Sequence, residues 1–339
     1  MYIIYALIGF GLLIIVHELG HFIMAKVNGI KVEEFSIGMG PKILSTQGKE
    51  TKYSLGLFPI GGYVKMLGEE EEVQDERSFS SKSPLRRISV IVAGAAMNFL
   101  FAILMYTIIL NKFGYALPVV DSVVEKSPAM EAGLQEGDKF LKVDGNKIYT
   151  SEDIQFAIGM AKNNSVDFLI ERNGEKYEYT ITPELVKDGN SERYMIGFGF
   201  KYINSPNIFD SFKHSFNKTI SAVNQTFTGL KMMVTGKLNL KTDVGGPVSI
   251  IRMSSAAAES GIWNLVYFLA YISINLAVMN MMPFPALDGG WTVILLIELI
   301  TRRKVPEKVV AAINYFGIMF LFGVMILVTI KDILFPISL

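Results

Sequence analysis

The first apolar stretch of the chain, Tyr2–Lys26, reads YIIYALIGFGLLIIVHELGHFIMAK and carries HELGH at residues 17–21. It is long enough to cross a bilayer as a helix. Two histidines and a glutamate in the middle of such a segment are expensive to insert, so we interpret them as functional. Residues four apart share one face of a helix, which allows His17 and His21 to bind one metal ion.

This H-E-x-x-H pattern also predicts a role for Glu18 as the general base that accepts a proton from the attacking water. The chain has no cysteine and only three histidines, which excludes thiolate metal sites and disulfide frameworks. We therefore predict a catalytic zinc site built from His17, His21 and one carboxylate. In the alternative reading the histidines only bond neighbouring helices, which leaves Glu18 without a partner.

Asp288 is the leading candidate for the third ligand. It follows the third apolar stretch, within NLAVMNMMPFPALDGGW, where Pro283 and Pro285 prevent a regular helix. Where the helix is broken, backbone and side-chain polar groups are exposed at a defined depth in the membrane. Glu298 is the competing ligand, although it lies further on in an apolar helix. Asp288 also suits the cap of the helix that follows it.

The hydropathy pattern predicts a polytopic α-helical membrane protein. Half of the residues are hydrophobic, and four segments are long enough to span a bilayer: Tyr2–Lys26, Ile88–Leu110, Trp263–Met282 and Ile313–Ile330. The first segment lacks the basic start and small-residue cleavage site of a signal peptide. The formal net charge is zero, which argues against nucleic acid as a partner.

Basic residues near the span ends predict the orientation of the chain in the membrane. Lysines follow the first span and arginines precede the second, and another basic cluster separates the third span from the fourth. Because basic loops remain cytoplasmic, both termini and the segment from Asn111 to Gly261 should face outward.

Three segments between the spans have their own patterns. Alternation and Gly/Pro punctuation in Lys31–Leu67 predict β-hairpins, whose apolar content suggests a return toward the membrane. Leu117–Phe200 has the composition of a small, mainly β soluble domain, with a helix at SEDIQFAIGMAKN and a hairpin turn at Asn173-Gly174.

A third pattern predicts an amphipathic helix from Phe209 to Leu230. Its apolar residues recur at spacings of three and four, and its other face carries Lys213, His214, Lys218 and Lys231. Such a helix suits a bilayer surface. Packing against the small domain is the alternative.

The motifs together resemble the site-2 protease family of intramembrane zinc metalloproteases. HELGHF and NMMPFPALDGG carry the resemblance, and FSIGMGP, PIGGYVKMLGE and GGPVSI narrow it to the bacterial RseP/RasP-like branch. SPAMEAGLQEGDKFLKVDGNKI is similar to the PDZ domain that this branch inserts between its second and third spans. The sequence has room for one such domain, whereas proteobacterial RseP has two. Ala95 also replaces a proline that is common in the family.

The resemblance implies specific roles for site residues. His17, His21 and Asp288 would be the zinc ligands, and Glu18 the catalytic base. Asn275 and Asn280 match asparagines that the family places beside the site. We assign these two, together with Pro283 and Pro285, to substrate binding.

These observations predict four regions: residues 1–110 with two spans and a membrane-associated β-hairpin region, 111–203 as the PDZ domain, 204–261 as a membrane-surface helix and linker, and 262–339 with two spans. By resemblance the chain is an endopeptidase of a bacterial cell membrane, with its active site toward the cytoplasm. Its substrates would be single-span proteins already trimmed by another protease, such as anti-sigma factors and remnant signal peptides. Membrane lipid, and a peptide or substrate outer domain at the PDZ domain, would be further partners. The rivals are a non-enzymatic PDZ scaffold with a vestigial metal site and a zinc transporter.

Overall fold

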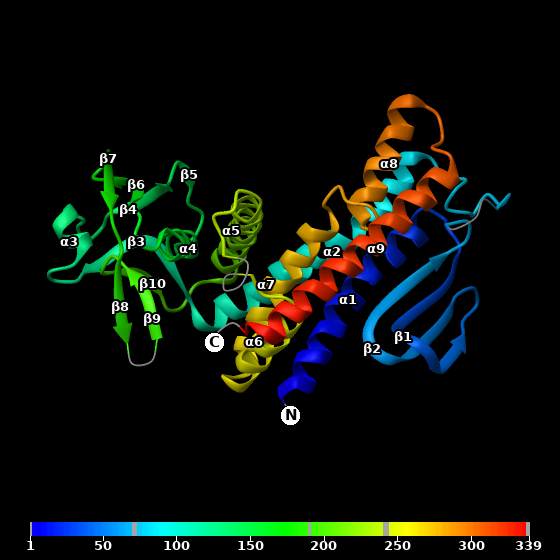
Figure 1. The fold of residues 1–339 in the computed structure, drawn as a ribbon, viewed down its shortest axis with the longest axis horizontal. Helices are drawn as coiled ribbons and strands as arrows, with labels where there is room; N and C mark the ends of the chain where they lie inside the picture. The colour runs from blue at the N-terminus through cyan, green and yellow to red at the C-terminus, as the bar shows by residue number, and fades with distance from the viewer. Residues whose placement is uncertain (1, 70–72, 189–190, 240–243, 337–339) are drawn as a thin grey trace. The chain divides into compact units, whose positions relative to one another are not determined.

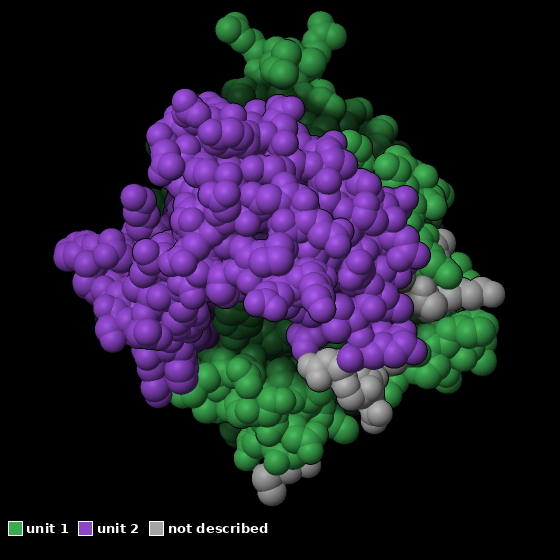
Figure 2. Space-filling model, turned by 90° about the vertical axis from the view of Figure 1, so that its left-hand side faces the viewer, with its two compact units in different colours: residues 1–102, 230–339 green, residues 103–229 purple. Residues whose placement is uncertain are grey.

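The computed structural model describes residues 2–69, 73–188, 191–239 and 244–336 (Figure 1). The chain forms two compact units. Unit 1 comprises residues 1–102 and 230–339, and unit 2 comprises residues 103–229 (Figure 2). The boundaries between the units fall within two long helices, α2 (Pro84–Phe113) and α5 (Ile208–Val234). Each unit is described separately below.

Among the described residues, four helices are long and apolar enough to cross a membrane, as predicted. They are α1 (Tyr2–Val27), α2, α7 (Ile262–Asn280) and α9 (Glu307–Leu334). α2 begins four residues before the predicted span, because Pro84 favours the first turn of a helix. Two shorter helices complete the helical part of unit 1: α6 (Pro247–Glu259), which packs against α1, α7 and α9, and α8 (Asp288–Thr301).

The hairpins expected in the first loop are present as two long, bent strands, β1 (Val32–Gln47) and β2 (Lys52–Met66). Residues 34–37 pair with residues 52–55 on one side and with residues 62–65 on the other, while 44–47 also pair with 52–55. The two strands therefore act as four short ones. In the described part of the chain, residues 62–66 form an outer edge with a strand neighbour on one side only.

Unit 2 contains a six-stranded sheet around one hydrophobic core. Its order is β10-β3-β4-β6-β7, and β5 pairs with β4. Phe140, Phe168 and Ile170 lie in this core with almost no exposure. The elements are β3 (Tyr115–Val123), α3 (Pro128–Ala132), β4 (Lys139–Val143), β5 (Asn146–Lys147), α4 (Ser151–Ala161), β6 (Val166–Arg172), β7 (Glu175–Ile181), the separate hairpin β8 (Glu184–Asp188) and β9 (Ser191–Met195), and β10 (Phe198–Ile203).

The hairpin predicted at Asn173-Gly174 joins β6 to β7. Arg172 pairs with Glu175, so the loop has two residues, and both have positive φ (54° and 86°). That conformation is the one Asn-Gly favours in a tight hairpin. The predicted helix after Thr150 is also present as α4.

The amphipathic helix is present as α5 (Ile208–Val234), but two residues of its polar face are buried. Within unit 2, His214 and Lys218 are buried, whereas Phe209, Phe212 and Phe216 are exposed. The polar face packs inward because α4 offers it partners. The polar face of α5 therefore packs on the small domain, which was the alternative interpretation of the sequence pattern.

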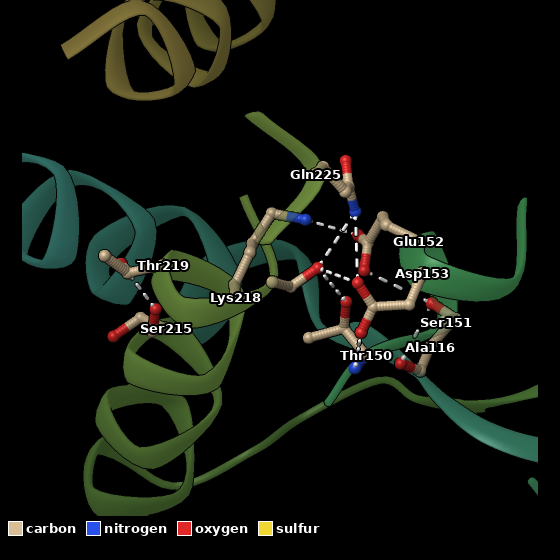
Figure 3. A network of polar contacts seen from close by, with 10 residues as sticks. Ala116, Thr150, Ser151, Glu152, Asp153, Ser215, Lys218, Thr219 and Gln225 are labelled. Atoms are coloured by element: carbon tan, nitrogen blue, oxygen red, sulfur yellow. Dashed lines mark hydrogen bonds and ion pairs between the residues drawn. The ribbon is translucent and has the colours of Figure 1, made fainter. Parts of the chain in front are cut away.

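Figure 3 shows these partners in a network of polar contacts between α4 and α5. Lys218 donates to Glu152, and Ser221 Oγ donates to Asp153 Oδ1 at 2.5 Å. Burial raises the pKa of Glu152, but the ammonium of Lys218 outweighs it and the net pKa is lowered. Burial also lowers the pKa of His214, to about 4, and this imidazole stacks on Tyr115 with ring centroids 3.9 Å apart.

Candidate metal centre

α1 brings the two histidines of the HELGH sequence onto one face. The rings of His17 and His21 meet nearly at right angles, and their Nε2 atoms lie 3.2 Å apart. His17 is 7% exposed. One helical turn separates the two residues, so their side chains point to the same place.

Glycines let α1 and α2 approach closely enough to enclose these rings. A Cβ at Gly20 would lie 2.2 Å from the carbonyl oxygen of Ala93. A Cβ at Gly94 would lie 2.5 Å from His21 Nε2. Any larger residue at Gly94 would therefore occupy the space that the imidazoles use.

Asp288 reaches the same point from the start of α8. Its Oδ2 lies 3.1 Å from His17 Nε2 and 3.5 Å from His21 Nε2. The loop before it is tightly packed: a Cβ at Gly289 would lie 2.2 Å from the carbonyl oxygen of Met282. The ligand atoms of the three residues all lie within 4.8 Å of one another.

The arrangement fits a tetrahedral metal ion. Bonds of about 2.0–2.1 Å to zinc separate neighbouring ligand atoms by roughly 3.3 Å, and the three distances here are 3.1, 3.2 and 3.5 Å. Asp288 Oδ2 is buried without a hydrogen bond. A cation among the three atoms would stabilise this buried carboxylate oxygen, which is costly to leave alone.

A second contact selects the tautomer of His21. Its Nδ1 lies 2.9 Å from the carbonyl oxygen of Val90. A carbonyl only accepts hydrogen bonds, so Nδ1 carries the proton and the lone pair of Nε2 faces Asp288. Val90 acts through its backbone, and no side-chain motif in the sequence indicates this role.

Comparisons with known proteins agree with this geometry. Residues 5–324 match Peptidase family M50. The chain belongs to this family. With its four apolar helices, it is a membrane peptidase.

Three relatives are similar to this M50 peptidase over nearly its whole length. A protein of Clostridium perfringens named as a zinc metalloprotease is 50% identical over 99% of this chain and 100% of its own length. A similarly named protein of Clostridium acetobutylicum is 44% identical over 99% and 98%. The regulator of sigma-W protease RasP of Bacillus subtilis is 29% identical over 96% of each chain.

Glu18 of the M50 peptidase lies beside β2. Its carboxylate lies next to the backbone of Val64, and a Cβ at Gly62 would lie 3.3 Å from Glu18 Cγ. Glu18 is therefore not one of the three residues whose ligand atoms cluster. A carboxylate in this place can accept a proton beside the metal without holding the metal itself.

The four residues assigned to substrate binding differ in position. Asn280 Nδ2 lies 3.3 Å from His17 Nε2, so the structure brings Asn280 to the cluster. Asn275 donates to the carbonyl oxygen of Tyr271 within α7.

Pro283 and Pro285 lie in the loop between α7 and α8. A Cβ at Gly317 of α9 would lie 2.5 Å from the side chain of Pro285. The backbone N–H of Ala286 donates to Asn314 Oδ1 at 3.2 Å. This loop, which carries Asp288 at its end, is therefore held by α9, and sequence reasoning missed Asn314.

Glu298, the competing ligand, has other partners. Its Oε2 accepts from Arg87, and its Oε1 accepts from the backbone N–H of Val305 at 3.1 Å. It is not among the three clustered ligands. A carboxylate already paired with an arginine is a poor choice for a metal ligand.

A cavity of about 1230 Å³ lies beside the outer edge of β2 within unit 1. Tyr63–Leu67 form one wall, and Trp291, three residues after Asp288, forms part of another. Because Val64 also contacts Glu18, the same strand edge borders both the cavity and the predicted base.

Proposed function

We propose that this M50 peptidase hydrolyses peptide bonds within or near the transmembrane segments of single-span proteins, in regulated intramembrane proteolysis. The substrates are proteins trimmed beforehand by another protease, including anti-sigma factors and remnant signal peptides. Zinc is its metal, as it is for the metalloproteases to which the chain is 50% and 44% identical. The observation that carries the proposal is the convergence of His17, His21 and Asp288 in a chain with four apolar helices.

His17 Nε2, His21 Nε2 and Asp288 Oδ2 would hold the metal, which when bound would supply Lewis-acid polarisation of the scissile carbonyl and a lower pKa for the attacking water. Glu18 accepts the proton of that water and passes it to the leaving amine. Glu18 suits this task because it follows His17 in the chain and lies beside β2, outside the cluster of the three ligand atoms.

A transmembrane substrate must unwind before it is cut, since helical peptide bonds are covered. Residues 62–66 offer a strand edge on which the unwound segment pairs by β-augmentation. That edge borders the cavity and reaches Glu18 through Val64. Asn275, Asn280, Pro283 and Pro285 complete the substrate site, and the asparagine amides satisfy backbone groups that are costly to leave bare in hydrocarbon.

The sheet of unit 2 is a PDZ domain that selects substrates. The regions 1–110, 111–203, 204–261 and 262–339 divide the chain by role. α5 lies on the membrane surface with its exposed phenylalanines toward lipid, while its polar face holds the domain through Lys218 and Ser221. The domain acts as a filter against substrates with bulky outer parts.

The protein spans a bacterial cell membrane several times. Basic residues near the span ends, Lys31 and Arg86 in the loop after the first span and Arg302 in the loop after the third, support a cytoplasmic position for these two loops. Both termini and the PDZ domain then face outward, and the active site opens toward the cytoplasm.

The test is cleavage of a single-span substrate by the purified full-length chain in lipid vesicles. A chelator should stop cleavage and zinc should restore it. Glu18→Gln keeps the shape of the side chain but cannot accept a proton, so cleavage should fall by about 10²–10⁴-fold. Metal analysis should find zinc retained in this variant. Substantial cleavage by Glu18→Gln protein would reject Glu18 as the base, and substrate binding without cleavage by the wild type would favour a scaffold.

A further inference from the structure

Asn98 of α2 is a buried amide in direct contact with a predicted metal ligand. It has no exposed surface, and its Nδ2 lies 3.4 Å from His17 Nδ1. Its Oδ1 is buried without a hydrogen bond. The backbone carbonyl of Asn98 accepts from Ser273 Oγ at 3.0 Å, which fixes this point of α2 against α7.

The geometry of His17 decides which of its nitrogens carries a proton when metal binds. Its Nε2 faces Asp288 Oδ2 at 3.1 Å and His21 Nε2 at 3.2 Å, so Nε2 must supply the lone pair. A neutral imidazole carries one proton, which must then lie on Nδ1. That N–H needs an acceptor, because a buried donor without a partner has lost its hydrogen bond to water and gained none in return.

His21 meets this requirement with the carbonyl oxygen of Val90. Among the described residues, the side chain of Asn98 is the group that lies within hydrogen-bond distance of His17 Nδ1. The oxygen and nitrogen of an amide have the same shape, and only the hydrogen-bond pattern tells them apart. With Nδ2 toward His17, the amide would force the proton onto Nε2 and remove the metal ligand.

We propose that Asn98 is a positioning residue that accepts a hydrogen bond from His17 Nδ1–H through Oδ1. In this orientation the oxygen and nitrogen of the Asn98 amide exchange places, so Oδ1 accepts the imidazole proton and Nδ2 is left without a partner. The opposite orientation also leaves one amide atom, Oδ1, without a partner. It directs the lone pair of His17 Nε2 at the metal. The inference rests on the proposed function, since it assumes that His17 is a zinc ligand.

The test measures the zinc affinity of the full-length chain in detergent by competition with a chelator. Asn98→Leu removes the acceptor at similar size, and zinc affinity should fall about 10–100-fold, the range for groups that orient metal-bound histidines. Asn98→Asp has only acceptor oxygens, so it should bind zinc at least as tightly as the wild type. Ser273→Ala is the matched control, because it removes a buried bond to the backbone of Asn98 without touching His17.

The Asn98→Asp variant decides the question even if the Asn98→Leu variant fails to fold. If the wild-type amide donates to His17, Asn98→Asp should disrupt the contact, because a carboxylate has no donor. A fall in the zinc affinity of Asn98→Asp of about 10-fold or more would therefore overturn the proposal, and so would wild-type affinity in folded Asn98→Leu protein. Ser273→Ala should retain wild-type affinity, and a loss equal to that of Asn98→Leu would show that packing is responsible. Failure of the wild type itself to bind zinc would instead overturn the proposed function.

Discussion

The molecule contains two buried polar clusters that differ in one respect. The network between α4 and α5 in unit 2 is closed: Asp153 accepts two bonds at each oxygen, from Ser221 and Gln225 at one and from the backbone of Tyr149 and Thr150 at the other. The candidate metal centre in unit 1 is open, because Asp288 Oδ2 is buried without a hydrogen bond and one end of the Asn98 amide has no partner in either orientation. Both clusters connect helices, yet only the open one has capacity for a further ligand.

Across the described residues, every buried side-chain nitrogen or oxygen atom that lacks a hydrogen bond lies in unit 1. Two are at the metal centre, and the others are Arg87 Nε and Thr292 Oγ1. Buried polar groups are normally paired, so an exception calls for an explanation. At the metal centre a cation explains both the unpaired carboxylate oxygen and the convergence of two imidazoles. The comparison teaches that a closed network stabilises structure and an open one indicates function.

The sharpest test of this comparison changes two buried carboxylates of unit 1: Asp288, which has an oxygen without a hydrogen bond, and Glu298, both of whose oxygens are paired. Asp288→Asn should weaken zinc binding by more than about 100-fold, because a neutral amide is a poor zinc ligand and even outer groups cost about 10–100-fold. Glu298→Gln should leave zinc affinity unchanged in folded protein, since Arg87 and Val305 already occupy that carboxylate. Chelator competition measures both. Tight zinc binding by Asp288→Asn with loss in Glu298→Gln would reverse the assignment of the third ligand.

A smaller effect should appear in unit 2 as the pH falls. The folded pKa of His214 is about 4, lowered mainly by burial, while an unfolded histidine titrates near 6.5. Of the nearby charges, Glu152 raises this pKa and Lys218 lowers it. The unfolded state therefore binds the proton first, and stability is lost as pH falls from about 6.5 toward 4. Between about pH 6.5 and 5 the loss should be about 2 kcal/mol.

His214→Phe is the comparison for that measurement, because it keeps a ring on Tyr115 but cannot titrate. Urea-dependent proteolysis of the full-length chain, read from fragments of residues 103–229, gives the stability of unit 2 at each pH. The variant should lose this part of the pH dependence. Equal slopes for the two proteins would show that His214 does not titrate in this window.

The smallest expected effect is the loss of one acceptor oxygen in the closed network. Asp153→Asn replaces an oxygen that accepts two bonds with an amide NH2, so two of the four donors lose their acceptor and unit 2 should lose about 1–2 kcal/mol of stability. Zinc affinity should not change. Asp167→Asn is the matched control on an exposed carboxylate that bonds Thr180, and it should cost less than about 0.5 kcal/mol. A fall in zinc affinity in Asp153→Asn would show that the two clusters are coupled, contrary to the comparison.

Local pattern predicted much of the fold. The apolar runs gave the four spans, and Asn173-Gly174 gave a hairpin turn, because both depend on a few consecutive residues. The spacing of Phe209, Phe212 and Phe216 also predicted a helix. It did not predict that His214 and Lys218 would be buried, because the buried face of an amphipathic helix depends on its partners. Here those partners, Glu152 and Asp153, lie more than sixty residues away in sequence.

The sequence by itself determined the chemistry available to this protein: without cysteine, a metal site in an apolar span must use histidine and carboxylate, and HELGH places two histidines and a base on one helix. The tertiary structure alone decided which carboxylate joins them, since Asp288 and Glu298 have the same ligand chemistry and differ only in their surroundings. It also brought Val90 and Asn98 to the outer nitrogens of the two imidazoles. Hydrogen bonds between helices depend on distances in space, and residue spacing along the chain does not contain them.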